Sequence, residues 1–252
     1  MPLAFHTARV GYAGPDALDI SRKSGGPLGL CFAPSWDLLK PYLDKRKAGA
    51  LTDQDWQEYR RRFLEEMRQS YQHHRRAWQE LLGQRHAVLC CYCDRYPCHR
   101  FLVAWCLLQM GAEYLGELDK DGTKPEHVAI VGSRPPKDDA GPGEHETWAR
   151  RIVPAVTAAV RALPGNVVLV SGGAPGVDQI AEREGKDLRR IILPAAWRQK
   201  GRQAGLIRNG WVSRIADSMI AAPSSWGSGT QHAIGLMERV VRKPVTILDC
   251  ST

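Results

Sequence analysis

The sequence has no long apolar run, no internal repeat and no low-complexity tract. A helix that spans a bilayer needs about 20 consecutive, mostly apolar residues, so we expect no contact with a membrane. The first residues, Met-Pro-Leu-Ala-Phe-His, lack the charged start and the apolar core of a secretory signal peptide. We therefore expect a soluble, cytoplasmic protein.

Charge is not concentrated in a tail either. The 252 residues carry 35 Lys and Arg against 27 Asp and Glu, a formal net charge of +8. A mildly basic protein suits a polyanionic partner such as a nucleic acid, and an ordinary solvated basic surface would give the same charge. Charge alone leaves both interpretations open.

Seven cysteines, an odd number, occur without a secretion signal. A framework of disulfides is therefore not expected. Four of the seven crowd into one short segment, namely Cys90, Cys91, Cys93 and Cys98. This crowding indicates metal binding, a reactive thiol or simple burial.

A polar segment with Gly and Pro, residues 120–126, separates two stretches with regular apolar patterns. We interpret it as a linker. It would join a domain over residues 1–119 to a second domain over residues 127–252.

The first stretch predicts a smaller α/β domain with a long helix. Ser35 is expected to cap one helix, and Thr52 or Asp53 to cap the long one, whose apolar residues recur at helical spacing. The expected strands cover residues 4–12, 28–32, 86–91 and 113–118, and the expected helices cover 36–47, 54–82 and 98–110.

In the second stretch, strands and helices alternate. This pattern predicts a Rossmann-like parallel sheet with helices on both faces, and a ligand beyond the carboxyl ends of the strands. The expected strands cover residues 127–131, 167–171, 190–193, 217–221 and 244–248, and the expected helices cover 145–162, 176–184, 205–215 and 230–241.

Three loops that follow these strands have the chemistry of an anion cradle. Glycine lets the backbone approach a ligand closely, and arginine offers a fork that matches phosphate. The second loop opens a helix, whose free amides and dipole favour an anion. Tight turns of an α/β sheet are the alternative interpretation. The expected ligand-binding residues are Gly132, Ser133 and Arg134, then Ser171, Gly172, Gly173, Ala174, Gly176, Val177 and Asp178, then Gly227, Ser228, Gly229 and Thr230, with Arg208 and Asn209.

These three loops and the Ile-Arg-Asn run at 207–209, in this order, resemble the superfamily that joins DNA-processing protein A to the Lonely Guy enzymes. Within this superfamily, which is called SLOG, the sequence most resembles the branch related to the YspA and YpsA proteins. It implies a nucleotide-type ligand. Lonely Guy enzymes are phosphoribohydrolases that pair an arginine with a glutamate three residues after the Gly-Thr loop, where this chain has Ala233. Arg208 would still hold phosphate, and Asp178 or Glu182 would supply a carboxylate.

The DNA-processing relatives bind single-stranded DNA instead. A basic run with interleaved tryptophans would suit a strand's backbone and bases, and a solvated loop is the alternative. The run comprises Trp197, Arg198, Lys200, Arg202, Arg208 and Trp211.

Three interpretations compete for the cysteine-rich segment. In the first, Cys98, His99 and Arg100 form an active or anion-binding site at a helix start, where the pKa of a thiol falls. In the second, zinc binds Cys91, Cys93, Cys98 and His99, although the spacing fits common zinc motifs poorly. In the third, cysteines such as Cys90 and Cys106 are simply buried. The Cys-His-Arg motif resembles domain-of-unknown-function family 488.

Together these features predict a two-domain protein that acts on nucleotides or nucleic acid. The favoured reaction is hydrolysis of a nucleotide or nucleoside bond such as the N-glycosidic bond, with Asp178 or Glu182 stabilising positive charge on the sugar. The alternatives are a non-catalytic nucleotide sensor, a single-stranded DNA-binding module, and a zinc-stabilised interaction protein. A homo-oligomer is also expected.

Overall fold

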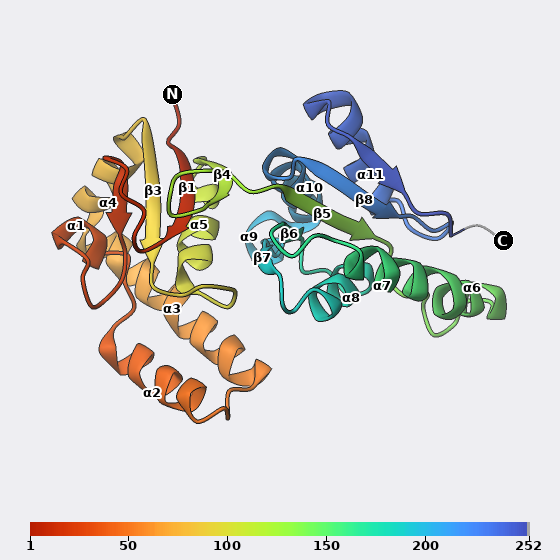
Figure 1. Cartoon of the computed structure of the whole chain (residues 1–252), viewed down its shortest axis with the longest axis horizontal. Coiled ribbons are helices and arrows are strands. Elements are labelled where there is room, and N and C mark those ends of the chain that lie inside the picture. The colour runs from red at the N-terminus through yellow and green to blue at the C-terminus, as the bar shows by residue number, and fades with distance from the viewer. Residues whose placement is uncertain (251–252) are drawn as a thin grey trace. The chain divides into compact units, whose positions relative to one another are not determined.

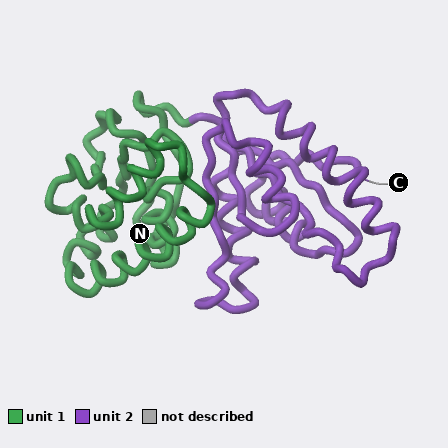
Figure 2. The backbone as a smooth tube through the Cα atoms, turned by 90° about the horizontal axis from the view of Figure 1, so that it is seen from below, with its two compact units in different colours: residues 1–124 green, residues 125–252 purple. Residues whose placement is uncertain are grey.

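The structure, a computed structural model, describes residues 1–250. The chain divides into two compact units, residues 1–124 and residues 125–252, which Figure 2 distinguishes by colour. The boundary between the units falls between Lys124 and Pro125. Each unit contains its own parallel sheet.

The first unit has a four-stranded sheet in the order β2-β3-β1-β4, and all of its neighbouring strands are parallel. Helix α5 packs on this sheet, and α3 packs on α5 (Figure 1). The elements are β1 (Ala4–Arg9), β2 (Ala17–Asp19), α1 (Pro27–Leu30), α2 (Trp36–Lys47), α3 (Asp53–His73), α4 (Arg75–Gly83), β3 (His86–Cys91), α5 (His99–Gln109) and β4 (Glu113–Leu118).

Both helix caps expected in this unit are confirmed. The Ser35 hydroxyl accepts the Leu38 amide at 3.2 Å. The Thr52 hydroxyl accepts the Asp55 amide at 3.2 Å, while the Asp55 carboxylate accepts the Thr52 amide at 3.0 Å. The second pair forms a capping box, which satisfies two backbone donors at the start of α3.

Two expectations for the first unit are wrong. Residues 28–32, expected as a strand, begin in the short helix α1, where Pro27 occupies the first helical position. The long helix expected over 54–82 is two helices, because the chain bends at His74 (φ −118°, ψ 37°). After the bend the Trp78 indole donates to the Ser70 hydroxyl at 3.1 Å and packs edge-on against Phe32. The bend therefore buries a large aromatic side chain in the core.

The second unit has a five-stranded parallel sheet in the order β7-β6-β5-β8-β9. Helices α7 and α8 cover one face, and α10 and α11 cover the other (Figure 1). The expected Rossmann-like class is confirmed. The elements are β5 (His127–Gly132), α6 (Pro142–Thr147), the π-helical η1 (Trp148–Ile152), α7 (Val153–Arg161), β6 (Val168–Ser171), α8 (Val177–Glu184), β7 (Arg189–Ile192), α9 (Trp197–Lys200), the 3₁₀ turn η2 (Gly201–Gln203), α10 (Ala204–Ile215), β8 (Ser218–Ala222), α11 (Gly229–Gly235), the π-helical η3 (Leu236–Val241) and β9 (Val245–Ile247).

Apolar strands explain why this sheet forms. Four consecutive residues of β6 are buried, and five of the six residues of β5 are buried. Parallel strands covered on both faces have such continuous apolar runs. Among residues 1–250, no helix is both long enough and apolar enough to cross a bilayer.

Candidate functional site

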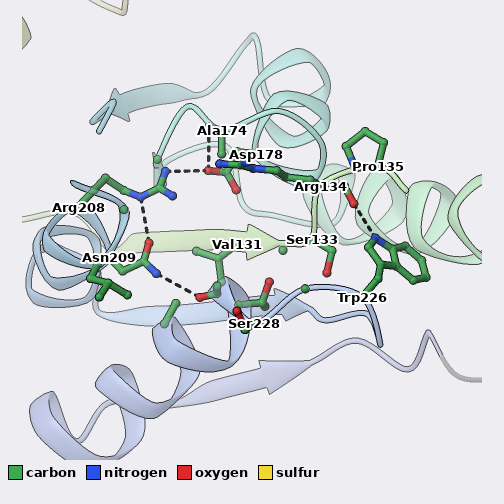
Figure 3. Close-up of a pocket in the computed structure, with 18 of the residues that line it drawn as sticks. Val131, Ser133, Arg134, Pro135, Ala174, Asp178, Arg208, Asn209, Trp226 and Ser228 are labelled. Carbon is green, nitrogen blue, oxygen red and sulfur yellow. Dashed lines mark hydrogen bonds and ion pairs between the residues drawn. The ribbon is translucent and has the colours of Figure 1, made fainter. Parts of the chain in front are cut away.

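The strand order of the second unit defines where a ligand is expected. The chain moves outward from β5 in one direction through β6 and β7, and in the other through β8 and β9. The loops after β5 and β8 therefore flank a topological switch point, at which open α/β sheets bind ligands. The loops after β5, β6 and β8 all contribute to one pocket of about 860 Å³ (Figure 3).

The pocket brings together most of the residues expected from the sequence. Some of its lining residues were not among those expected, and they come from the long loop after β5, from α6, from α10 and from the start of the third loop. The expected lining residues are Gly132, Ser133, Arg134, Gly172, Ala174, Asp178, Arg208, Asn209, Gly227, Ser228, Gly229 and Thr230, and the additional ones include Lys137, Asp139, Glu144, Leu206, Val212 and Trp226.

The first loop places a buried hydroxyl in the pocket wall. Ser133 is 3% exposed, and within residues 1–250 its Oγ has no hydrogen-bond partner. The neighbouring Gly132 allows the first loop to pack closely against Val177, because a Cβ at Gly132 would lie 2.5 Å from the Val177 side chain. An unsatisfied buried hydroxyl is unfavourable, so Ser133 Oγ is a group that a bound ligand would satisfy.

The second loop corrects one expectation, since amides at the start of α8 are already engaged. The Val177 amide donates to the Ser133 carbonyl at 3.2 Å, and the Ala174 amide donates to Asp178 Oδ2 at 3.1 Å. The Gly173 amide donates to Ser171 Oγ at 3.1 Å. Asp178 thus supplies the negative charge that the helix dipole favours, and these amides are not available to a phosphate.

Arg208 links the second loop to the third. Its Nη1 lies 3.4 Å from Asp178 Oδ2, and its Nε donates to Asn209 Oδ1 at 2.9 Å (Figure 3). Asn209 Nδ2 in turn donates to the Gly229 carbonyl at 3.1 Å. A Cβ at Gly172 would lie 1.7 Å from Arg208 Nη1, so a side chain there would displace the guanidinium. The guanidinium is therefore fixed in the pocket wall with partners on two sides.

Burial raises the pKa of Asp178, and the nearby Arg208, the Ala174 and Gly172 amides and Arg134 act in the opposite direction. Asp178 is 4% exposed. A carboxylate surrounded by donors and guanidinium groups is stabilised in its charged form. These donors oppose the effect of burial, and Asp178 is a hydrogen-bonded carboxyl group of the pocket wall that is paired with Arg208.

The third loop opens α11 and forms the opposite wall. A Cβ at Gly229 would meet nothing within 4 Å, so this turn faces open space. The Trp226 indole donates to the Arg134 carbonyl at 3.0 Å and joins the third loop to the first. Ala233 also lines the pocket, so no carboxylate occupies the position where the resemblance places a catalytic glutamate.

The pocket rim is rich in cations and carries an aromatic ring. Arg134, Lys137 and Arg202 line it in addition to Arg208. The Trp197 side chain also lines it and is 51% exposed. From the basic run expected in the sequence, Arg198, Lys200 and Trp211 are not among the described lining residues.

Glu182 lies behind the second loop and is not among the described residues that line the pocket. Its Oε1 accepts the Ser171 hydroxyl at 2.5 Å. Burial raises the pKa of Glu182 to about 7, although the hydrogen bond from Ser171 lowers it. Glu182 therefore supports the second loop from behind through Ser171, and it interacts electrostatically with Asp178 and Arg208 of the pocket wall.

This raised pKa predicts a pH-dependent stability. Unfolded glutamate titrates near 4.5 and folded Glu182 near 7, so the folded state binds the proton more tightly. The contribution of Glu182 to the free energy of unfolding is fully present below pH 4.5 and is lost as the pH rises through 7. The free energy of unfolding changes by at most about 3 kcal/mol over this range. We expect Glu182→Gln to be more stable than the wild type above pH 7 and similar at pH 5, as measured by urea unfolding.

The control is Glu238→Gln, which replaces an exposed glutamate. It should follow the wild-type pH dependence. If the free energies of unfolding of wild type and Glu182→Gln changed in parallel from pH 5 to 8, the raised pKa of Glu182 would be contradicted.

The cysteine-rich segment of the first unit joins the end of β3 to the start of α5. Cys98 caps α5, and its Sγ accepts the Arg100 amide at 3.5 Å. Arg100 is fully buried, and its Nη2 donates to Glu117 Oε1 at 2.8 Å. Cys98 and His99 are 2% and 5% exposed. Arg100 thus faces internal partners, and the interpretation of Cys98, His99 and Arg100 as an active or anion-binding site stays a prediction.

One side-chain group in this segment is suited to a metal. The ligand atoms of Cys91, Cys98 and His99 all lie within 4.8 Å of one another. The interaction with the Cys93 thiol, together with burial, raises the pKa of the Cys91 thiol to about 12.

The molecule thus combines an α/β unit that has a buried Cys-His-Arg cluster with a Rossmann-like unit that has a cationic pocket at its switch point. Residues 30–111 match the family DUF488-N3a, described as the active DUF488-N3 subclade. The resemblance of the first unit to family 488 is thereby confirmed. A similar protein is the gene 61 protein of Mycobacterium phage D29, 35% identical over 79 residues, which cover 28% of this chain and 63% of that protein.

A similar solved structure is DNA processing protein A from Helicobacter pylori, studied for its single-stranded DNA binding mode. The identity is 18% and the TM-score 0.33, with 49% of this chain and 65% of that chain covered. The chain therefore spans less than two thirds of the length of both similar proteins. A structural likeness of this degree assigns neither a ligand nor an activity.

Proposed function

We propose that the second unit binds the phosphate of a nucleotide or of a single-stranded nucleic acid in the switch-point pocket. The observation that carries this proposal is the convergence of three glycine-containing loops around the fixed guanidinium of Arg208. Arginine offers phosphate a planar set of donors. Ser133 Oγ adds a buried donor that lacks a partner within the described chain.

The shape and lining of the pocket support a ligand of nucleotide size. Its volume of about 860 Å³ lies within the usual range for small-molecule sites. The exposed ring of Trp197 offers a surface on which a base would stack. Arg134, Lys137 and Arg202 would attract a polyanion to the rim.

The finer proposal is hydrolysis of an N-glycosidic bond. Asp178 is the carboxylate that lines the pocket next to the phosphate clamp, and it would stabilise positive charge that develops on the sugar. Glu182 would act only from behind the Ser171 hydroxyl. The second candidate is a non-catalytic nucleotide sensor or strand-binding module, favoured by Ala233 at the position expected to hold a glutamate.

Binding and turnover are tested together on the full chain. Titration calorimetry with nucleoside mono-, di- and triphosphates and with short single-stranded DNA and RNA is expected to show a ligand with sub-millimolar affinity. A steep loss of affinity with salt identifies a strand, and a weak salt dependence identifies a mononucleotide. Chromatography of the same mixtures detects released base.

Release of base that Asp178→Asn abolishes would support hydrolysis. Binding without release would support the sensor or strand-binding module. Absence of binding across the panel at low salt would contradict the proposed function in both forms.

A further inference from the structure

The buried cluster of the first unit has the geometry of a metal site. Cys91 ends β3, whereas Cys98 and His99 begin α5. The turn between these elements brings two sulfurs and an imidazole nitrogen to within 4.8 Å of one another. All three side chains are at least nine-tenths buried, so a reactive thiol, which needs access for its partner, fits this position poorly.

The spacing within the cluster matches tetrahedral zinc. His99 Nδ1 lies 3.6 Å from Cys91 Sγ. Zinc binds sulfur at about 2.3 Å and nitrogen at about 2.0–2.1 Å, so these two ligand atoms of a tetrahedral site lie about 3.6 Å apart. The observed distance therefore leaves room for the ion without moving the two ligands.

A hydrogen bond fixes the imidazole in the state that a metal requires. His99 Nε2 donates to the Ile20 carbonyl at 2.9 Å. A carbonyl only accepts, so the proton of neutral His99 is on Nε2, and Nδ1 presents its lone pair to the sulfurs. Metal-binding histidines are held by this kind of outer hydrogen bond.

Donors also surround the sulfur of Cys98. The Arg100 amide lies 3.5 Å and Arg100 Nη1 lies 3.6 Å from Cys98 Sγ. Outer donors of this kind hold a metal ligand in place.

The geometry points to a zinc site formed by Cys91, Cys98 and His99. Cys93 follows Cys91 in the same turn and is the candidate fourth ligand; its sulfur lies outside the group of atoms within 4.8 Å and would have to move toward the ion. The Arg46 guanidinium lies 4.0 Å from Cys93 Sγ.

The surrounding charges suit this ligand set. Zn²⁺ with three thiolates carries one negative charge. Arg46 and Arg100 together with Glu117 carry one positive charge and neutralise it. A buried ion needs this kind of compensation.

The test uses the full chain, purified without a histidine tag and under reducing conditions. Elemental analysis is expected to give about one zinc per chain, as a four-ligand structural site binds tightly. Titration of the metal-free chain with Co²⁺ should produce a thiolate-to-cobalt charge-transfer band and the intense visible bands of tetrahedral cobalt. Failure of the wild-type chain to bind either metal overturns the proposal without reference to any variant.

Variants then assign the ligands. Cys98→Ala and His99→Ala are expected to lose stoichiometric zinc, and Cys93→Ala to bind cobalt more weakly with an altered visible spectrum. The matched control is Cys90→Ala, since Cys90 adjoins Cys91 in β3 but its Sγ points to the Val88 carbonyl at 3.5 Å. Circular dichroism checks that each variant is folded. Metal binding that survives Cys98→Ala, or that Cys90→Ala abolishes equally, would overturn the assignment.

Discussion

Replacing Arg208 by methionine is expected to weaken the binding of nucleotide or oligonucleotide by about 10- to 100-fold. A hydrogen bond to a charged group contributes about 1.5–3 kcal/mol, and each 1.4 kcal/mol changes the affinity tenfold. The variant also removes the guanidinium that lies 3.4 Å from Asp178 Oδ2, so this buried carboxyl loses its charged partner in the pocket wall. Titration calorimetry with the best ligand of the panel measures the change.

Arg214→Met is the matched control for this experiment. Arg214 lies on the same helix, α10, and is exposed. It is not among the described residues that line the pocket, so its replacement should change the affinity less than twofold. Equal affinities for the two variants, at unchanged helical content, would show that Arg208 does not hold the ligand.

Replacing Glu117 by glutamine is expected to lower the free energy of unfolding of the first unit by about 3 kcal/mol. Arg100 and Glu117 form an ion pair with side chains that are 0% and 3% exposed. Removal of one partner from such a pair leaves an uncompensated buried charge, which destabilises proteins by about 3–5 kcal/mol. The carbonyls of Cys93 and Asp94 also accept from Arg100 and reduce the loss. Urea unfolding followed by tryptophan fluorescence measures it.

The comparison variant is Glu58→Gln, in which an exposed glutamate loses its pairing with Arg61 at 2.6 Å. Exposed pairs of this type contribute little to stability, so no resolvable change in the unfolding midpoint is expected. An unfolding midpoint of Glu117→Gln equal to that of the wild type would mean that the buried Arg100–Glu117 pair contributes little to the stability of the fold.

The second unit could be predicted almost completely from the sequence, and the first only in part. Runs such as Val128–Val131 and Val168–Val170 are apolar because both faces of a parallel strand are buried. In the first unit the run 28–32 is also apolar but begins in a helix. An apolar run this short does not distinguish a strand from a buried helix. The bend at His74 depends on the burial of Trp78 against Phe32, a contact that local periodicity does not encode.

The candidate site shows the same division. Glycine-rich loops in strand–loop–helix context located the pocket, since glycine content is a local signal. The engagement of the Val177 and Ala174 amides was not predicted, because it depends on how the Ser133 carbonyl and the Asp178 carboxylate are placed in three dimensions. The thiols likewise have unfavourable spacing as a zinc motif, and only the turn from β3 to α5 brings them together.

The carboxylate beside Arg208 has a thermodynamic consequence. A free arginine side chain loses considerable rotational entropy when it grips a ligand. Here Asp178 and Asn209 already hold the guanidinium between them, so this wall is preorganised and Arg208 exchanges its contact with Asp178 for a contact with the ligand. Association should then proceed with little rearrangement of this wall. The relative affinities of different ligands should depend on how well each one competes with the Asp178 carboxyl group for Arg208.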